Sequence, residues 1–118
     1  MKLLVVVTAS PWGSSLPGAA LRLVRAAKRS GHEVPAVYFR DDGVYHALRG
    51  RHVDGGQAPA LDDWLAVAGS DTELLICSAA AGRRIDVTDV ANTTPALRAA
   101  GLSRMWSLVA DCDQVVTF

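Results

Sequence analysis

Residues 3–7 have the sequence LLVVV, and residues 8–15 follow with the sequence TASPWGSS. A continuous run of Leu and Val is typical of a strand that is covered on both faces, as in a parallel sheet. The proline, the glycine and the hydroxyl side chains mark the second stretch as a loop. Similar apolar runs at residues 33–39, 73–77 and 113–118 predict three further strands.

Segments with helical periodicity lie between these strands. Apolar residues recur every three or four positions around residues 20–27, 61–68 and 102–109, and Gly31 is placed to end the first of these helices. Shorter helices are expected at residues 44–48 and 78–84. The alternation of strands and helices predicts an α/β protein with three layers, in which helices cover both faces of a mostly parallel sheet of four to five strands.

Two stretches show no clear period. Residues 49–58 contain three glycines and predict a loop, the most mobile part of the chain. Residues 85–100 fit either a polar helix or a loop, so a strand near residues 97–100 stays open.

The composition indicates one domain, residues 1–118. The chain has 118 residues, 50% of them hydrophobic, and a formal net charge of zero, which excludes a disordered protein. The charges are divided unevenly, because residues 1–51 carry a net +5 and the remainder −5. This division fits contacts between subunits, and it fits equally well two solvated faces.

The length of the apolar runs argues against a membrane protein. Spanning a bilayer takes roughly 20 apolar residues, and a secretory signal core takes about 7–15. The opening run is shorter than either, so we expect a buried strand in a cytoplasmic protein.

The chain has two cysteines, Cys77 and Cys112, and three histidines. Their spacing matches no zinc motif, so we expect no metal. A disulfide between the two cysteines stays open. Cys112 lies on the edge of the apolar side of the last helix and is interpreted as structural.

Cys77 is the strongest candidate for chemistry. Ligands of parallel sheets gather beyond the carboxyl ends of the strands, and Cys77 ends an apolar strand just before small residues. Amides at a helix N-terminus and a nearby guanidinium, such as that of Arg83 or Arg84, favour the thiolate and make a usable nucleophile. The alternative is a packed, inert thiol, which is the more frequent role of a cysteine at such a position.

Other candidates lie at the same expected edge. Trp12 in the loop 8–15, together with Tyr38 and Tyr45, could form a pocket around Cys77. The loop could also cradle a phosphate, although it lacks a glycine-rich fingerprint and a plain connection is favoured. His46 is a weak candidate because no partner residue lies at a spacing that suggests a triad.

Several of these pieces together resemble the DsrE/TusD family of sulfur-relay proteins. The likeness covers most of the chain and rests on motifs in the order in which the family has them. They are the first strand with Thr8 and the PWG loop at 11–13, GHE at 31–33, VYF at 37–39, DGVY at 42–45 with Ala47, IC at 76–77 with AAA at 79–81 and RR at 83–84, and CDQVV at 112–116 with Phe118. The family has a fourth strand ending in a Ser-Gly-Leu-Gly-like turn, whereas residues 97–103 read LRAAGLS here.

The resemblance implies a cytoplasmic sulfurtransferase subunit with a DsrE-like fold. Cys77 matches the family cysteine, which carries sulfane sulfur as a persulfide and needs neither a metal nor another cofactor. The sulfur would come from a TusA-like donor and pass to a DsrC/TusE-like acceptor, serving either 2-thiouridine synthesis in tRNA or sulfur oxidation. Arg83 and Arg84 would stabilise the persulfide or contact a neighbouring subunit.

The resemblance also implies an oligomer. The chain would join related DsrF/DsrH-like or TusC/TusB-like subunits in a hexamer, or copies of itself, without binding nucleic acid or a membrane directly. Two alternatives stay open: a scaffold subunit in which Cys77 only packs, and a small flavin- or nucleotide-binding module that uses the loop 8–15.

Overall fold

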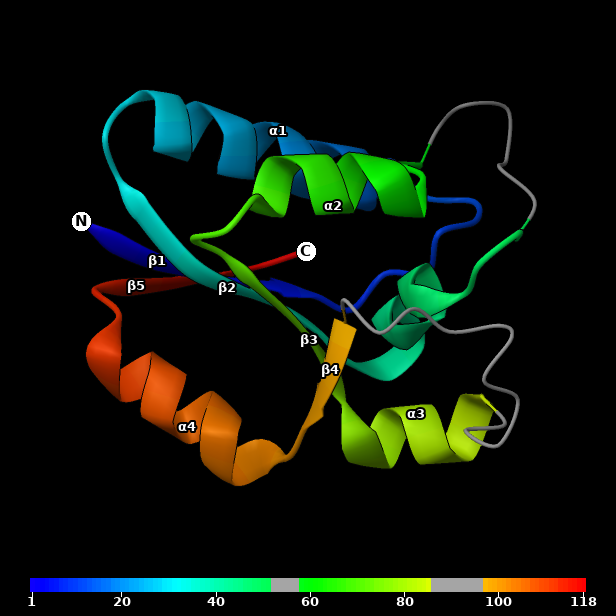
Figure 1. The fold of residues 1–118 in the computed structure, drawn as a ribbon. Coiled ribbons are helices and arrows are strands. Elements are labelled where there is room, and N and C mark those ends of the chain that lie inside the picture. Colours follow the sequence, from blue (N-terminus) through cyan, green and yellow to red (C-terminus); the bar gives the residue numbers. More distant parts are fainter. Residues whose placement is uncertain (52–57, 86–96) are drawn as a thin grey trace.

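The computed structural model describes residues 1–51, 58–85 and 97–118 and contains a five-stranded sheet. The strand order is β4-β3-β2-β1-β5, and every neighbouring pair is parallel (Figure 1). The strands are β1 (Lys2–Val7), β2 (Glu33–Phe39), β3 (Glu73–Cys77), β4 (Leu97–Ala100) and β5 (Gln114–Thr117). The predicted parallel sheet is therefore confirmed.

Helices cover both faces of the sheet, so the prediction of three layers is also confirmed. Figure 1 shows α1 (Leu16–Arg29) and α2 (Leu61–Ala68) on one face, and α3 (Ser78–Arg84) and α4 (Leu102–Asp111) on the other. A 3-10 helix, η1 (Asp41–Ala47), follows β2 at the carboxyl edge of the sheet, where the sequence predicted a short helix at 44–48.

The core forms where the apolar runs of the strands meet the helices. Residues 3–7 of β1 are all buried, as a strand covered on both faces must be. Neighbouring side chains of β2 point to opposite faces. Phe39 packs edge-to-face on Trp64 of α2, with ring centroids 5.2 Å apart, so Tyr38 points toward the layer of α3 and α4.

The connection from β2 into η1 depends on a glycine. A Cβ on Gly43 would lie 2.0 Å from the carbonyl oxygen of Val7, so the backbone of η1 approaches the end of β1 more closely than any other residue permits. The amide of Arg40 donates to the same Val7 oxygen at 3.0 Å. Together these contacts fix η1 above the carboxyl end of the sheet.

The open question about residues 97–100 is answered by β4. This strand pairs with β3 in parallel, with Leu74 opposite Leu97 and Cys77 opposite Ala100. The segment LRAA has little intrinsic strand preference, so hydrogen bonding to β3 decides its structure. Residues 52–57 of the predicted loop and residues 86–96 of the ambiguous stretch lie outside the described residues.

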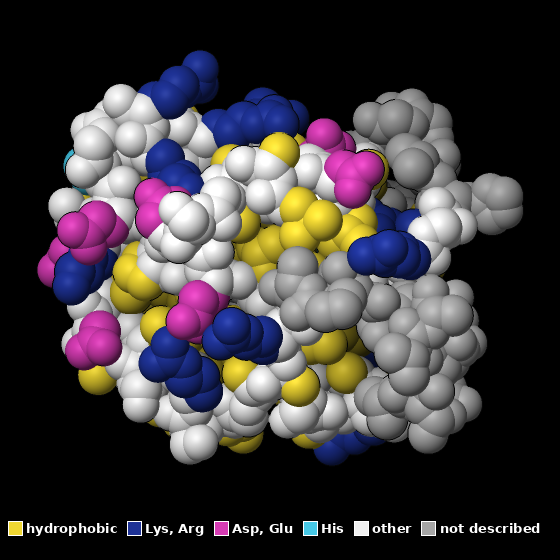
Figure 2. All heavy atoms as spheres, viewed as in Figure 1, with side chains coloured by type: hydrophobic (Ala, Val, Ile, Leu, Met, Phe, Trp, Pro, Cys, Tyr) yellow, Lys and Arg dark blue, Asp and Glu magenta, His cyan; other side chains and the backbone are white. Residues whose placement is uncertain are grey.

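Both edges of the sheet leave apolar surface accessible. On β5, Val115 is 41% exposed, and on α4, Trp106 is 65% exposed and Leu102 is 54% exposed. On the side of β4, Figure 2 shows hydrophobic side chains in a hollow between α2 and β4, and a groove of about 320 Å³ there is lined in part by Leu65, Leu74 and Arg98. Within the described parts of the chain, no helix has the length and apolar character to cross a membrane.

Candidate functional site

Cys77 lies where the sequence placed it, at the carboxyl end of a core strand. It is the last residue of β3 and the N-cap residue of α3, so its side chain stands at the junction of a strand and a helix. Its residue surface is 7% exposed, and the thiol is free. The carboxyl edge of the sheet therefore holds a buried cysteine that forms no disulfide bond.

Tyr38 approaches this cysteine from the neighbouring strand. Its hydroxyl donates to the carbonyl oxygen of Ala100 at 3.0 Å, and Ala100 is the strand partner of Cys77. Burial and a side-chain hydrogen bond with Cys77 raise the pKa of Tyr38 well above its usual value. The structure thus brings Tyr38 and Cys77 together, and the tyrosine stays a hydrogen-bond donor across the ordinary pH range.

The chain after β4 also begins its helix beside Cys77. Gly101 is the N-cap residue of α4, and a Cβ on it would lie 3.9 Å from the hydroxyl oxygen of Ser78, the first residue of α3. The first residues of α3 and α4 are therefore neighbours. Both helices start next to the strand pair that carries Cys77 and Ala100.

Trp12 and Tyr45 form a second group at this edge. Their rings pack at a tilt, with centroids 5.7 Å apart, and Trp12 is 38% exposed. Tyr45 lies near enough to Arg84, the last residue of α3, to raise the pKa of its guanidinium. Trp12, Tyr45 and Arg84 are thus linked around η1 and the end of α3.

The two arginines of α3 have different environments. Arg84 forms an ion pair with Asp42 of η1 at 2.9 Å, and its guanidinium also donates to the carbonyl oxygen of Ala80. The hydrogen bond with Asp42 raises the pKa of Arg84. Arg83 is exposed to solvent. The charge of Arg84 is engaged within the chain, an arrangement that sequence reasoning did not foresee.

Sequence reasoning missed one residue of this edge, Arg40. It follows β2 directly, is half-buried, and its charge acts on the Tyr38 hydroxyl, partly opposing the rise in the pKa of Tyr38. Strand register was the signal that could have found it. Residues that follow paired parallel strands lie side by side, as Arg40 and Cys77 do after the pair Phe39 and Ile76.

The loop 8–15 is held by its own hydroxyl groups and by the carbonyl oxygen of Phe118, which accepts hydrogen bonds from Thr8 and Ala9. The Ser10 hydroxyl donates to the carbonyl oxygen of Trp12 at 2.8 Å, and Ser14 accepts from the amide of Leu16 at 3.2 Å. Below the loop, the Nε2–H of His46 donates to the carbonyl oxygen of Ala9 at 3.1 Å. Because a carbonyl only accepts, this bond fixes the tautomer of the ring and makes His46 a support of the loop.

His46 is fully buried in an aromatic cluster. Its ring lies 5.4 Å from that of Phe39 and 6.0 Å from that of Trp64, measured between centroids. Its Nδ1 has no hydrogen-bond partner in the described part of the chain, and burial lowers the pKa of His46 to about 4. The side chain is therefore neutral at physiological pH.

Cys112 occupies the structural position that the sequence predicted. It is the C-cap residue of α4, is half-buried and is a free thiol. Burial and the neighbouring Asp111 raise the pKa of Cys112, which disfavours its thiolate. It therefore offers a matched control for experiments on Cys77.

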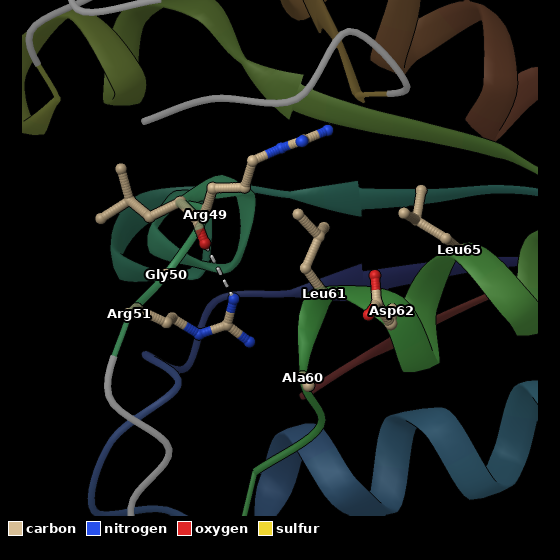
Figure 3. A pocket seen from close by; sticks show the side chains of 8 residues that line it. Arg49, Gly50, Arg51, Ala60, Leu61, Asp62 and Leu65 are labelled. Carbon is tan, nitrogen blue, oxygen red and sulfur yellow. Dashed lines mark hydrogen bonds between the residues drawn. The ribbon is translucent and has the colours of Figure 1, made fainter. Parts of the chain in front are cut away.

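A cavity of about 360 Å³ lies between η1 and α2 (Figure 3). Leu61 and Leu65 line it from α2, and Arg49 and Arg51 line it from the segment that follows η1, with side chains that point in different directions. The Arg51 guanidinium donates to the carbonyl oxygens of three residues that flank the cavity, and these are His46, Leu48 and Pro59. The charge of Arg51 thus ties the end of η1 to the start of α2. Among the described residues that line the cavity there is no cysteine or serine.

Among the residues described, no three His, Cys, Asp or Glu side chains converge as metal ligands would.

The fold and the site together define a small three-layer α/β protein with a cysteine buried at the carboxyl edge of a parallel sheet. The sequence model of the DsrE/DsrF-like family matches residues 1–118. The chain therefore belongs to the DsrE/DsrF-like family.

Individual relatives agree with this assignment. The protein named sulfurtransferase TusD from Salmonella newport is 31% identical over 134 residues, and the protein of the same name from Salmonella arizonae is 30% identical over 128 residues. Each match covers 100% of both chains. The crystal structure of the ychN protein from E. coli has the same fold, with a TM-score of 0.76 at 19% identity, covering 99% of this chain and 98% of that one.

Proposed function

We propose that this protein is a sulfurtransferase subunit that carries sulfane sulfur as a persulfide on Cys77. The observation that carries the proposal is the placement of Cys77, a free thiol at the carboxyl edge of the sheet with the Tyr38 hydroxyl beside it. The TusD relatives, which match along their whole length, support sulfur transfer as the reaction class.

Sulfur is accepted in one displacement. The Cys77 thiolate attacks the terminal sulfur of a donor persulfide, and a new bond forms between Sγ and that sulfur. The sulfur–sulfur bond of the donor breaks at the same time, and the donor leaves as a thiolate. The transferred sulfur keeps its oxidation state, so the step requires no external oxidant or reductant.

Sulfur is delivered by a second displacement, in which Cys77 is the leaving group instead of the nucleophile. The thiolate of an acceptor protein attacks the outer sulfur of the Cys77 persulfide, and Cys77 leaves as the thiolate that began the cycle. The low exposure of Cys77, 7%, limits attack by small reductants between the two steps. The proposal requires that a partner thiol reach this sulfur at the carboxyl edge of the sheet.

We infer the partners from the same family relationship. A TusA-like protein would donate the sulfur, a DsrC/TusE-like protein would accept it, and related subunits or copies of this chain would complete an oligomer in the cytoplasm, where thiols stay reduced. The sulfur would end in tRNA 2-thiouridine or in a sulfur-oxidation pathway. The exposed apolar side chains of Trp106 and Leu102 are consistent with contacts to other subunits.

A reconstituted relay with radiolabelled sulfur tests the proposal. A cysteine desulfurase supplied with labelled cysteine loads the donor, and label on the acceptor is measured with wild-type protein, Cys77→Ser and Cys112→Ser. We expect transfer with the wild type and with Cys112→Ser, and none above background with Cys77→Ser. Transfer that persists with Cys77→Ser would instead make this chain a scaffold subunit.

A further inference from the structure

Strand register places a cation beside Cys77. The pairs Tyr38 with Leu75 and Phe39 with Ile76 align β2 with β3, so the next residues along, Arg40 and Cys77, stand side by side. Arg40 keeps extended backbone angles, φ −131° and ψ 168°, and therefore continues the alternation of β2. Its side chain leaves the sheet on the same face as that of Tyr38.

Two other arginines, Arg84 and Arg51, are already engaged in interactions within the chain. Arg84 is paired with Asp42, and the nearby Asp41 also acts on Arg84. Arg51 is bound to three backbone carbonyl groups. Arg40 forms no ion pair within the ranges 1–51, 58–85 and 97–118, so its half-buried guanidinium is available to an anion at this edge.

Tyr38 connects this cation with the sulfur. Its fully buried hydroxyl lies against the Ala100 carbonyl, and both Arg40 and Cys77 act on it electrostatically. A phenol has one proton to donate and rotates about its C–O bond. While the Cys77 sulfur is neutral, the Tyr38 hydroxyl donates its proton to the Ala100 carbonyl oxygen. An anionic sulfur is a stronger hydrogen-bond acceptor than the carbonyl, so the hydroxyl then donates to the sulfur instead.

We propose that Tyr38 donates a hydrogen bond to the anionic sulfur of Cys77, as thiolate or as persulfide, and that Arg40 supplies the positive charge of the site by acting through Tyr38. The inference rests on the proposed function, because it assigns roles at the same sulfur. Tyr38 touches the reacting atom, whereas Arg40 is a positioning residue. In this proposal Arg40, and not Arg83 or Arg84, supplies the positive charge near the sulfur.

The rate of alkylation of Cys77 by iodoacetamide, measured against pH in a Cys112→Ser background, tests this assignment. Tyr38→Phe keeps the buried ring and removes the hydroxyl, and we expect the rate at pH 7 to fall about tenfold, as losing one hydrogen bond to a charged group implies. Arg40→Gln should lower it by about threefold, less at high salt. In both variants the midpoint of the rate profile moves to higher pH.

Controls separate this role from a structural one. Arg40→Lys keeps the charge and should restore most of the rate, and Arg29→Gln, at an exposed position of α1, should leave the profile unchanged. Adding Arg40→Gln to Tyr38→Phe should have no further effect if Arg40 acts through the hydroxyl. An additive loss in the double variant would overturn that part of the proposal, and unmoved profiles in folded single variants would overturn all of it.

The result is independent of sulfur transfer. Alkylation reports the state of the Cys77 thiol, whereas persulfide loading reports the proposed function. Shifted profiles in a protein that never accepts sulfur would refute the function alone. Normal loading together with unmoved profiles would refute the roles of Tyr38 and Arg40 alone.

Discussion

Neutral His46 should make the stability of this protein depend on pH. Its pKa is about 4 in the folded protein, against an ordinary value of 6.5, because the ring is buried between Phe39 and Trp64. Between these two pH values the unfolded chain binds a proton that the folded protein does not bind. The free energy of unfolding therefore falls as the pH is lowered from 6.5 toward 4, and the contribution is fully present only above pH 6.5.

The structure sets the size of this effect. One pKa unit corresponds to about 1.4 kcal/mol, so the shift amounts to about 3 kcal/mol in total, most of which is lost by pH ~4.5. This is a large share of the ~5–15 kcal/mol that stabilises a typical domain. Protonation would also put a new N–H on Nδ1, which finds no acceptor among the described residues.

Urea unfolding at a series of pH values measures the effect. We expect the wild type to lose about 2–3 kcal/mol between pH 7 and pH ~4.5 beyond the loss shown by His46→Gln, which cannot titrate and keeps a donor for the Ala9 carbonyl. Identical pH dependence in wild type and His46→Gln would refute the reasoning.

Two further predictions concern packing and capping. Gly43→Ala should lower the free energy of unfolding by about 2 kcal/mol or more, because its Cβ would meet the Val7 carbonyl, whereas Gly82→Ala in the open interior of α3 should raise it by about 0.5–1 kcal/mol. Urea midpoints that shift in the same direction for both variants would contradict this account. Lys28→Met should cost about 1–3 kcal/mol, because the ammonium group donates to the carbonyl oxygens that end α2 and to Asp71 at 2.6 Å. Thermal unfolding of Lys28→Met beside Arg25→Met, an exposed control on the same helix, checks this, and equal losses would speak against it.

Much of the fold could be predicted because the strands of a parallel sheet are apolar throughout. The run at residues 3–7 and the run ending at Cys77 each have few structural alternatives in a chain of this length. Helical periodicity located α1, α2 and α4 in the same way. These predictions depend on local sequence, and the structure confirms them.

The remaining features depend on contacts between distant residues. Residues 97–100 become β4 because β3 offers an edge to pair with, which the composition of that segment does not reveal. Arg40 follows an apolar strand, and no local sequence pattern marks it as a site residue. Only the register of β2 and β3 places it beside Cys77. The ion pair between Arg84 and Asp42, 42 residues apart, likewise appears only when η1 and α3 are packed together.

The candidate site was predicted in part. Cys77 and Tyr38 are brought together as the sequence suggested, because each belongs to a strand of the same parallel sheet. Trp12 and Tyr45 pair with each other, and Tyr45 acts on Arg84 at the end of α3; a pocket that these rings form around Cys77 stays a prediction. Their positions depend on a 3-10 helix and a loop, whose geometry has no simple periodic signal.

Mass spectrometry of the protein after incubation with a cysteine desulfurase and cysteine tests the central claim most directly. The account predicts that the peptide containing Cys77 gains the mass of one sulfur atom, that a thiol reductant removes it, and that the peptide containing Cys112 stays unmodified. An unmodified Cys77 peptide under conditions in which a TusA-like donor is loaded would contradict the claim that this protein carries sulfur.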